Sequence, residues 1–322
     1  MKKAISRTCT IEAPCKINLH LKIGNKRPDG FHNLESLFAA LAFGDTISFQ
    51  ETGNKGALTL ETEWEGPENA VPNPIPIEEN LVFKAVSLFR RLTGYENGLN
   101  IHLLKRIPPG AGLGGGSSDA ASTLLALNFL AETDLGFKKL REMALSLGSD
   151  VPFFLSGGAA YVSGRGELIE PVKPPGNLWV VLVKPPFFSN TAYAYRRLDE
   201  IREKAPLPDI KAEDVSKERI ISALASSEDP RSWPFYNDFL PVFLAAREGE
   251  DREKALCLKA ILEELGRLGA DFAGLSGSGS CCFGIFTDRE KAEKAQKKLS
   301  GHENYPKLSF FLAQKADPVL KY

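Results

Sequence analysis

The sequence lacks several features that would assign it to a large class of proteins. No apolar run approaches the roughly 20 residues of a membrane span, and the N-terminus, MKKAISRTCTIEAP, lacks the apolar stretch of a signal peptide. The five cysteines form no CxxC pair and are odd in number, at Cys9, Cys15, Cys257, Cys281 and Cys282. Neither a disulfide framework nor a structural zinc site is expected.

The charge excludes a further class. The formal net charge is −1, without the basic excess that nucleic-acid-binding proteins carry. Hydrophobic residues make up 43% of the chain and charged residues 25%, as in ordinary globular proteins. We therefore expect a soluble, cytoplasmic protein of two domains that binds neither membranes nor nucleic acid.

The periodicity of apolar residues predicts an alternation of strands and helices. In the first half we expect strands over 8–23 broken at Pro14, a turn and strand in GDTISF (44–49), a loop over the proline-containing 62–79, a helix from Asn80 to Gly94, a strand over 99–107, and helices over 119–132 and 137–147. In the second half we expect strands over 178–186, 271–275, 281–286 and 308–313, and helices over 191–204, 213–226, 254–268 and 288–299.

The second-half pattern predicts helices packed on one face of an antiparallel sheet. If 281–286 is a strand, Cys281 and Cys282 point to opposite faces. The EPVKPPGN stretch near residue 172 is the expected domain boundary.

A glycine-rich segment, PPGAGLGGGSS (108–118), follows the predicted strand over 99–107. Glycine lets the backbone approach an anion closely and adopt positive φ, and successive N–H groups can then surround a phosphate at the start of a helix. Ser117 or Ser118 is placed to cap that helix. The pattern predicts a phosphate loop. A flexible linker is the alternative, but the strand and the apolar helix on either side argue against it.

Two other nucleotide motifs do not fit. A Walker A loop requires a lysine after the glycines, and none follows here. Gly110, Gly112 and Gly115 match G-x-G-x-x-G, but the βαβ context and a following acidic residue at a strand end are missing.

The loop, extended as PPGAGLGGGSSDAA, resembles the phosphate loop of the GHMP kinase superfamily, which includes galactokinase, homoserine kinase and mevalonate kinase. Three more segments narrow the resemblance to the 4-diphosphocytidyl-2-C-methyl-D-erythritol kinase family: APCKINLHLKIGNKRPDGFHNLESLF (13–38), LGSDVPFFLSGGAAYVSGRGE (147–167) and LSGSGSCCFG (275–284). The resemblance spans nearly the whole chain.

The resemblance implies an α+β fold of two domains with the active site in the cleft between them. Residues 1–172 would form an N-terminal α/β domain like ribosomal protein S5, and residues 173–322 a ferredoxin-like α+β domain. It also implies a reaction of the non-mevalonate route to isoprenoid precursors. ATP would phosphorylate the 2-hydroxyl of 4-diphosphocytidyl-2-C-methyl-D-erythritol.

Residue roles follow from the resemblance, position by position. Asp150 matches the catalytic aspartate, which would accept the hydroxyl proton. Lys16 matches its partner lysine, and Asn18 would hold the substrate. Without the flanking motifs, Asp150 reads as a turn residue and Lys16 as a solvent-facing lysine.

The cytosine site is implied by other positions. Phe31 and His32 match the pair that recognises the pyrimidine, with phenylalanine where the family usually has tyrosine. Thr191 and Tyr195 resemble the opposite wall, although Tyr195 reads equally well as helix packing.

For ATP, the resemblance implies contacts from the loop itself: Pro108, Pro109, Gly110, Ala111, Gly112, Leu113, Gly114, Gly115, Gly116, Ser117 and Ser118. Asn80 and Lys105 would line the nucleotide; the alternatives are a simple helix cap and an exposed strand residue. Gly277 and Ser278, in a second glycine cluster, would lie near the loop or the substrate diphosphate; alone they read as a hairpin turn.

Phosphoryl transfer implies Mg²⁺, held mainly by phosphates with Ser117 or Ser118 nearby and without assignable protein ligands. Asp119 would contribute through water or favour the helix start.

We expect a monomer or weak homodimer. Two alternatives remain: another kinase of the superfamily, such as a mevalonate-route or homoserine kinase, and a nucleotide-binding regulator without catalysis.

Overall fold

The computed structural model describes residues 7–65, 75–173, 178–204, 215–226, 229–246, 248–300 and 309–314. The elements of the first half are β1 (Thr8–Lys26), β2 (His32–Thr52), β3 (Leu58–Trp64), α1 (Leu81–Thr93), β4 (Gly98–Lys105), α2 (Gly115–Leu130), α3 (Phe137–Leu147), β5 (Ala159–Gly164) and β6 (Leu168–Val172). Those of the second half are β7 (Trp179–Lys184), α4 (Thr191–Lys204), α5 (Lys217–Ala225), α6 (Phe239–Leu244), α7 (Gly249–Arg267), β8 (Phe272–Leu275), β9 (Cys282–Phe286), α8 (Arg289–Ser300) and β10 (Ser309–Gln314). Short 3-10 helices cover Ile77–Glu79, Val151–Leu155 and Pro230–Ser232.

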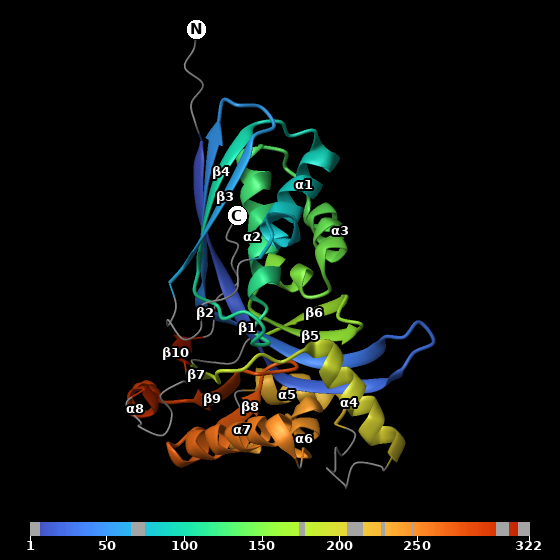
Figure 1. Cartoon of the computed structure of the whole chain (residues 1–322), viewed down its shortest axis with the longest axis vertical. Helices are drawn as coiled ribbons and strands as arrows, with labels where there is room; N and C mark the ends of the chain where they lie inside the picture. The colour runs from blue at the N-terminus through green and yellow to red at the C-terminus, as the bar shows by residue number, and fades with distance from the viewer. Residues whose placement is uncertain are drawn as a thin grey trace.

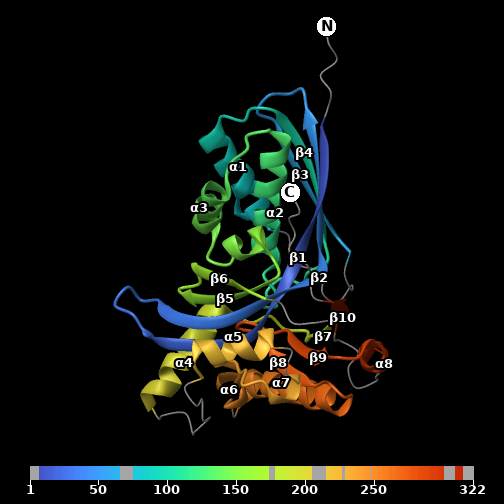
Figure 2. The ribbon, with the colours of Figure 1, turned by 180° about the vertical axis from the view of Figure 1, so that it is seen from behind.

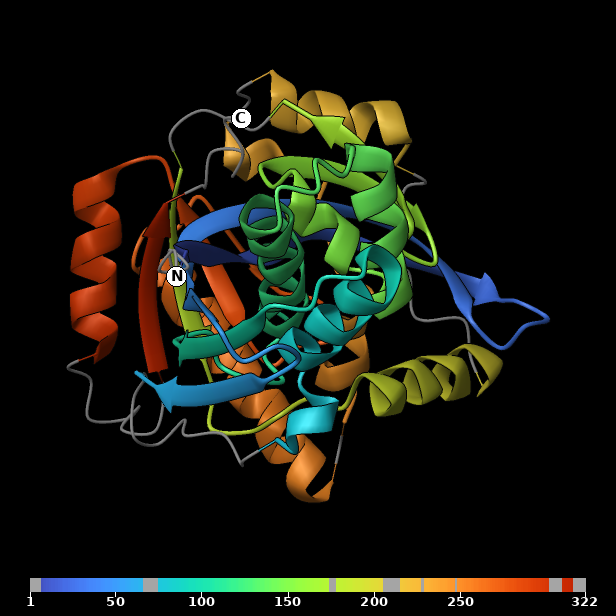
Figure 3. The same cartoon turned by 90° about the horizontal axis from the view of Figure 1, so that it is seen from above.

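The first half is a sheet covered by helices. Its strand order is β3-β4-β2-β5-β6, with β1 paired to β2. β3 and β4 run parallel, and the other pairs are antiparallel. Helices α1, α2 and α3 cover one face (Figures 1 and 3), and Phe49, Phe89 and Phe153 are fully buried in the core between them.

The second half is an antiparallel sheet of order β10-β7-β9-β8. One face, with Val181 and Cys282, packs against α4, α6, α7 and α8. The other face, with Leu182 and Cys281, packs against α5 and the β1–β2 hairpin. The predicted separation of the two cysteines is confirmed, as is the helical layer, except that α5 lies on the opposite side.

The β1–β2 hairpin connects the halves and corrects two predictions. Figures 1 and 2 show it passing from the first sheet across the second. Pro14 does not break the strand, and GDTISF contains no turn, because Pro14 pairs with Gly44 at a bulge within continuous strands. A bulge tolerates proline, which has no N–H for the ladder. Gly44 is required there, since a Cβ would lie 2.2 Å from the Ala13 carbonyl oxygen.

The central helix α2 starts earlier than predicted. It begins at Gly115 rather than Asp119, and its N-cap is Gly114 in a left-handed conformation with φ of 72°. The prediction that Ser117 or Ser118 caps this helix is wrong, because both already lie in its first turn. The glycine run is therefore partly loop and partly helix start. The predicted cap and end of α1 are confirmed, with Asn80 Oδ1 accepting from the Val82 N–H and Gly94 left-handed.

Other boundaries differ in smaller ways. α7 begins at Gly249 rather than 254, and the six-residue α6, which contains Pro241, was not predicted. In the proline-containing stretch, residues 62–64 end β3, and 66–74 lie outside the described residues, as do 213–214 and 308. We propose residue 172, where β6 ends, as the domain boundary. Within the described ranges, no helix combines the length and apolarity that crossing a membrane requires.

We expect Gly44→Ala to lower the free energy of unfolding by about 1–3 kcal/mol, because the new methyl group would press on the backbone of the bulge. Gly53→Ala is the matched control at the end of the same strand; its Cβ would meet nothing within 4 Å, so the change should stay within about 0.5 kcal/mol. Urea denaturation of both variants measures this. Equal midpoints for the two variants would contradict the role given to Gly44.

Candidate active site

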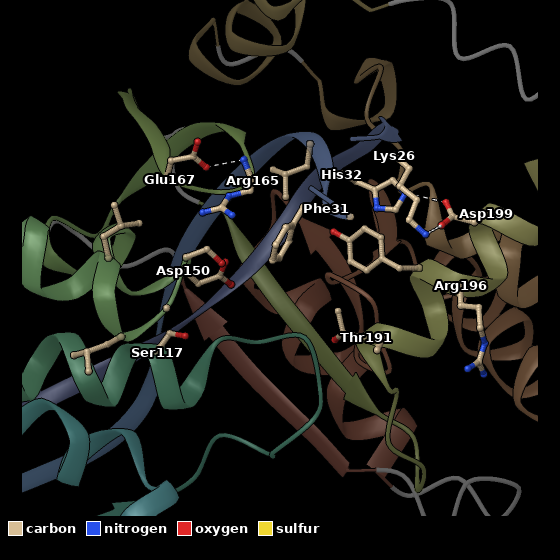
Figure 4. Close-up of a pocket in the computed structure, with 18 of the residues that line it drawn as sticks. Lys26, Phe31, His32, Ser117, Asp150, Arg165, Glu167, Thr191, Arg196 and Asp199 are labelled. Carbon is tan, nitrogen blue, oxygen red and sulfur yellow. Dashed lines mark hydrogen bonds and ion pairs between the residues drawn. The ribbon is translucent and has the colours of Figure 1, made fainter. Parts of the chain in front are cut away.

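Two adjoining clefts are present, and the first of them is lined by residues of both halves. The first, of about 1130 Å³, is bounded by the β1–β2 hairpin, the β5–β6 turn and α4; we call it the hairpin cleft (Figure 4). The second, of about 730 Å³, is lined by the glycine loop 108–117 and by β3; we call it the glycine-loop cleft. Leu81 and Ser117 line both, so a ligand in one cleft would lie next to a ligand in the other.

The glycine loop has the backbone that the sequence predicts. Gly110, Gly112 and Gly114 have φ of 60°, 76° and 72°, which only glycine adopts readily. Gly114 leads directly into α2, whose first N–H groups have no partner within the helix. A helix start behind a glycine loop is a ready anion site.

The second glycine cluster folds back on this loop. Ser276 Oγ donates to the Gly112 carbonyl at 2.8 Å, and the Cys281 N–H donates to the Ala111 carbonyl at 3.1 Å. A Cβ on Gly112 would lie 2.1 Å from the Ser276 carbonyl oxygen. The segment is thus both the β8–β9 hairpin turn and a support for the glycine loop. The side-chain amide of Asn237 stabilises this segment by donating to the Leu275 and Gly277 carbonyls.

Lys16 and Asp150 form a pair next to the glycine loop. Lys16 Nζ lies 3.6 Å from Asp150 Oδ2 and donates to Asn18 Oδ1 at 2.6 Å. Burial lowers the pKa of Lys16, while Asp150 acts in the opposite direction. The Lys16 side chain is only 4% exposed and packs next to Gly114. The lysine therefore packs against the glycine loop and pairs with a carboxylate that lines the hairpin cleft.

Aromatic side chains form the far end of the hairpin cleft. His32 stacks on Tyr195 with ring centroids 5.0 Å apart, and its Nε2 lies 2.8 Å from Asp199 Oδ1. Phe31 is 55% exposed and lines the same cleft. Tyr195 also packs edge-on against Phe239, so both interpretations of Tyr195, cleft wall and helix packing, describe it.

Thr191 links this wall to the glycine cluster, because its Oγ1 lies 2.8 Å from Ser278 Oγ. Asn18 is buried, and its Nδ2 donates to Ser36. Thr191 thus lines the hairpin cleft, whereas Asn18 lies beneath the surface and contacts Lys16.

The glycine-loop cleft contains the predicted Asn80 and Lys105. Asn80 is a helix cap and also lines the cleft. Lys105 is not an exposed strand residue. Its Nζ binds Asp119 Oδ2 at 2.6 Å and also contacts Asp45, whose side chain is fully buried.

This buried triad carries one lysine and two carboxyl groups. Burial raises the pKa of Asp119 to about 7, against the effect of Lys105 and reinforced by Asp45. Burial lowers the pKa of Lys105, but the two carboxylates outweigh it and raise that pKa overall. Asp119 is therefore paired with Lys105. It lies beyond the first turn of α2, so its predicted role at the helix start is wrong, and its contribution through water stays a prediction.

Comparison with known proteins identifies the family. The GHMP kinases N terminal domain matches residues 80–158, and the GHMP kinases C terminal domain matches residues 251–304. The 4-diphosphocytidyl-2-C-methyl-D-erythritol kinase of Treponema pallidum (strain Nichols) is 36% identical over 299 residues, covering 91% of this chain and 95% of that protein. The chain belongs to the 4-diphosphocytidyl-2-C-methyl-D-erythritol kinase family.

Further matches agree with this family. The chloroplastic enzyme of that name from Oryza sativa subsp. japonica is 48% identical over 189 residues, covering 58% of this chain and 45% of the rice protein. A crystal structure of 4-(cytidine 5'-diphospho)-2C-methyl-D-erythritol kinase superposes with a TM-score of 0.73 and 31% identity over 96% of this chain and all of that one. The mevalonate kinase of L. major, in complex with R-mevalonate, has a TM-score of 0.68 at 17% identity, covers 99% of both chains and shares the fold. The predicted fold and enzyme class, a kinase, are confirmed.

Family membership does not by itself point to three residues that line the clefts. Asp199 lies four residues after Tyr195, so helical spacing could have placed it on the same face. Trp64 enters the glycine-loop cleft from β3, beside the stretch interpreted as a loop. Arg165 lies in the β5–β6 turn, and the sequence alone gives no signal for its neighbours.

We expect the free energy of unfolding to fall as the pH rises from about 4 to about 7. The pKa of Asp119 is raised from 3.8 to about 7, so the folded state retains a proton that the unfolded chain has lost. This contribution is present at low pH and is lost as the pH rises through the folded pKa; linkage gives at most about 4 kcal/mol. Asp119→Asn should remove this decline, whereas the exposed Asp134→Asn should keep it. Urea denaturation across this pH range measures both, and parallel profiles for wild type and Asp119→Asn would exclude the assignment.

Proposed function

We propose that this enzyme transfers the γ-phosphoryl group of ATP to the 2-hydroxyl of 4-diphosphocytidyl-2-C-methyl-D-erythritol, in the non-mevalonate route to isoprenoid precursors. The observation that supports the proposal is that Lys16, packed against Gly114 of the glycine loop, lies 3.6 Å from Asp150, which lines the hairpin cleft. A donor phosphate on the glycine loop and an acceptor alcohol in the hairpin cleft would meet there.

Asp150 is the proposed general base. It lies at the start of the 3-10 helix Val151–Leu155 and lines the hairpin cleft, where an ionised carboxylate accepts the proton of the attacking hydroxyl. Lys16 is the proposed stabiliser of charge on the transferring group. Its burial removes competing water, and Asn18 holds its ammonium group in place.

The acceptor would lie along the hairpin cleft with its base at the aromatic end. Phe31 provides a ring face for stacking, and His32, whose ring is held by Asp199, is proposed to read the pyrimidine edge. Thr191 and Tyr195 line the facing wall, and Gly277 and Ser278, with Ser278 Oγ 2.8 Å from Thr191 Oγ1, are proposed to lie near the glycine loop or the substrate diphosphate. Replacement of the family's usual tyrosine by Phe31 keeps the stacking face.

ATP, the phosphoryl donor of GHMP kinases, would bind the glycine loop, with its adenine in the slot between β3 and Asn80. The described residues include no cluster of three or more metal-ligating side chains, which suits a Mg²⁺ ion held mainly by phosphates with Ser117 at hand. When bound, Mg²⁺ neutralises phosphate charge. Lys105, bound to two carboxylates, is proposed to shape the base of this cleft.

The other predictions about the molecule, a cytoplasmic monomer or weak homodimer, stay predictions. A different acceptor, such as mevalonate or homoserine, would leave the aromatic end of the hairpin cleft without a role. A regulator without catalysis would not need the Lys16–Asp150 pair.

The substrate experiment measures ADP release by the purified protein with Mg²⁺, ATP and each of three acceptors: 4-diphosphocytidyl-2-C-methyl-D-erythritol, mevalonate and homoserine. We expect turnover only with the first. Turnover with mevalonate or homoserine alone would overturn the assignment of the aromatic end and keep the phosphate loop.

We expect Asp150→Asn to lower kcat by about 10²–10⁴-fold with little change in the Kd of ATP, because the amide cannot accept the proton. Single-turnover phosphoryl transfer and nucleotide titration measure the two effects. Asp134→Asn, the same change at an exposed site, is the control and should keep full activity. Full turnover by Asp150→Asn would remove the base assignment and favour the regulator.

A further inference from the structure

The β5–β6 turn places an arginine between the two ends of the hairpin cleft. The Arg165 guanidinium lies 4.7 Å from the centroid of the Phe31 ring. Its neighbour Gly166 packs against Ser149, the residue before Asp150; a Cβ on Gly166 would lie 3.2 Å from Ser149 Cβ. Arg165 is thus anchored beside the proposed base and extends over the aromatic side chain (Figure 4).

The charge of Arg165 is available for a ligand. The other cationic chains of the cleft wall have carboxylate partners: Lys26 Nζ lies 3.2 Å from Asp199, and Arg196 Nε lies 3.9 Å from Glu200. In the part of the chain that the structure describes, the Arg165 guanidinium forms no ion pair; its charge adds only to the effect of Arg27, the salt-bridge partner of Asp29, in lowering the Asp29 pKa. Nearby Glu167 accepts instead from the Arg165 backbone N–H, at 2.6 Å.

Resting on the proposed function, we propose that Arg165 binds the diphosphate of the nucleoside diphosphate acceptor and so positions its alcohol toward Asp150. Such an acceptor carries two phosphates between its base and its alcohol, and Arg165 lines the same cleft as the Phe31 ring proposed to stack the base and the Asp150 carboxylate proposed to receive the proton. A planar guanidinium offers paired donors that match phosphate oxygens. Contact with the Phe31 face restricts its orientation, which lowers the entropy lost on binding.

This proposal makes Arg165 a positioning residue whose role can be recognised from which ligands it helps to bind. It should strengthen binding of ligands that carry the diphosphate and leave binding of the bare nucleoside unchanged. A residue that merely supported Phe31 would affect both ligands equally. Comparison of CDP with cytidine therefore separates the two roles.

The test is isothermal titration of wild type, Arg165→Gln, Arg165→Lys and Arg289→Gln with CDP and with cytidine. A saturating non-hydrolysable ATP analogue fills the glycine-loop cleft. Arg289 is the matched control, an arginine stacked at 4.9 Å on Trp179 at the start of α8. We expect Arg165→Gln to weaken CDP binding by about 10–100-fold, the worth of charge-assisted hydrogen bonds, with cytidine binding unchanged. Arg165→Lys should fall between, and Arg289→Gln should match wild type.

Turnover supplies a second readout: in Arg165→Gln the KM of the acceptor should rise and kcat should fall, because the alcohol is positioned less well toward Asp150, while the KM of ATP stays near wild type. Equal weakening of CDP and cytidine, or no weakening of CDP, overturns the role of Arg165 and leaves the proposed function intact. If wild type binds neither ligand, the nucleoside diphosphate acceptor itself is wrong and both proposals fall.

Discussion

The site depends on three backbone segments that approach each other more closely than side chains would allow. The Lys16 N–H donates to the Leu113 carbonyl at 2.9 Å, and the β8–β9 turn bonds to Ala111 and Gly112 from the other side. No Cβ fits at Gly112 in this contact. Strand β1, the glycine loop and the second glycine cluster therefore form one unit, and the reacting groups keep their spacing because that unit is held together through the main chain.

Buried charge is arranged around this unit in two different ways. Lys16 is buried next to the Asp150 carboxylate, which remains partly exposed. Lys105 is buried between two carboxyl groups, so its charge is used within the protein. Removing an ion from water costs several kcal/mol unless partners offset it. The cost of burying Lys16 is partly offset by one carboxylate, and the cost of burying Lys105 is offset by two.

Local signals in the sequence predict the structure correctly where the conformation of a segment depends on neighbouring residues alone. The Asn80 cap, the end of α1 at Gly94 and the anion-binding character of residues 108–118 depend on neighbouring residues, and family resemblance supplied the pairing of Lys16 with Asp150. Pro14 was misread because its tolerance depends on Gly44 across the hairpin. The start of α2 was misread because glycine, a poor helix former, is held in the helix by packing. Asp45, Arg165 and Trp64 join the site only through contacts that are distant in sequence.

The shared wall of the two clefts has a pharmacological consequence. Because Leu81 and Ser117 line both cavities, the proposed function implies that a single bisubstrate compound, with an adenosine joined to a cytidine-like ring through an anionic linker, would fill them together. Such a compound would avoid part of the association entropy that two separate ligands lose. Its selectivity over kinases that share only the glycine loop would come from contacts at the aromatic end of the hairpin cleft, where side chains rather than loop backbone surround the ligand.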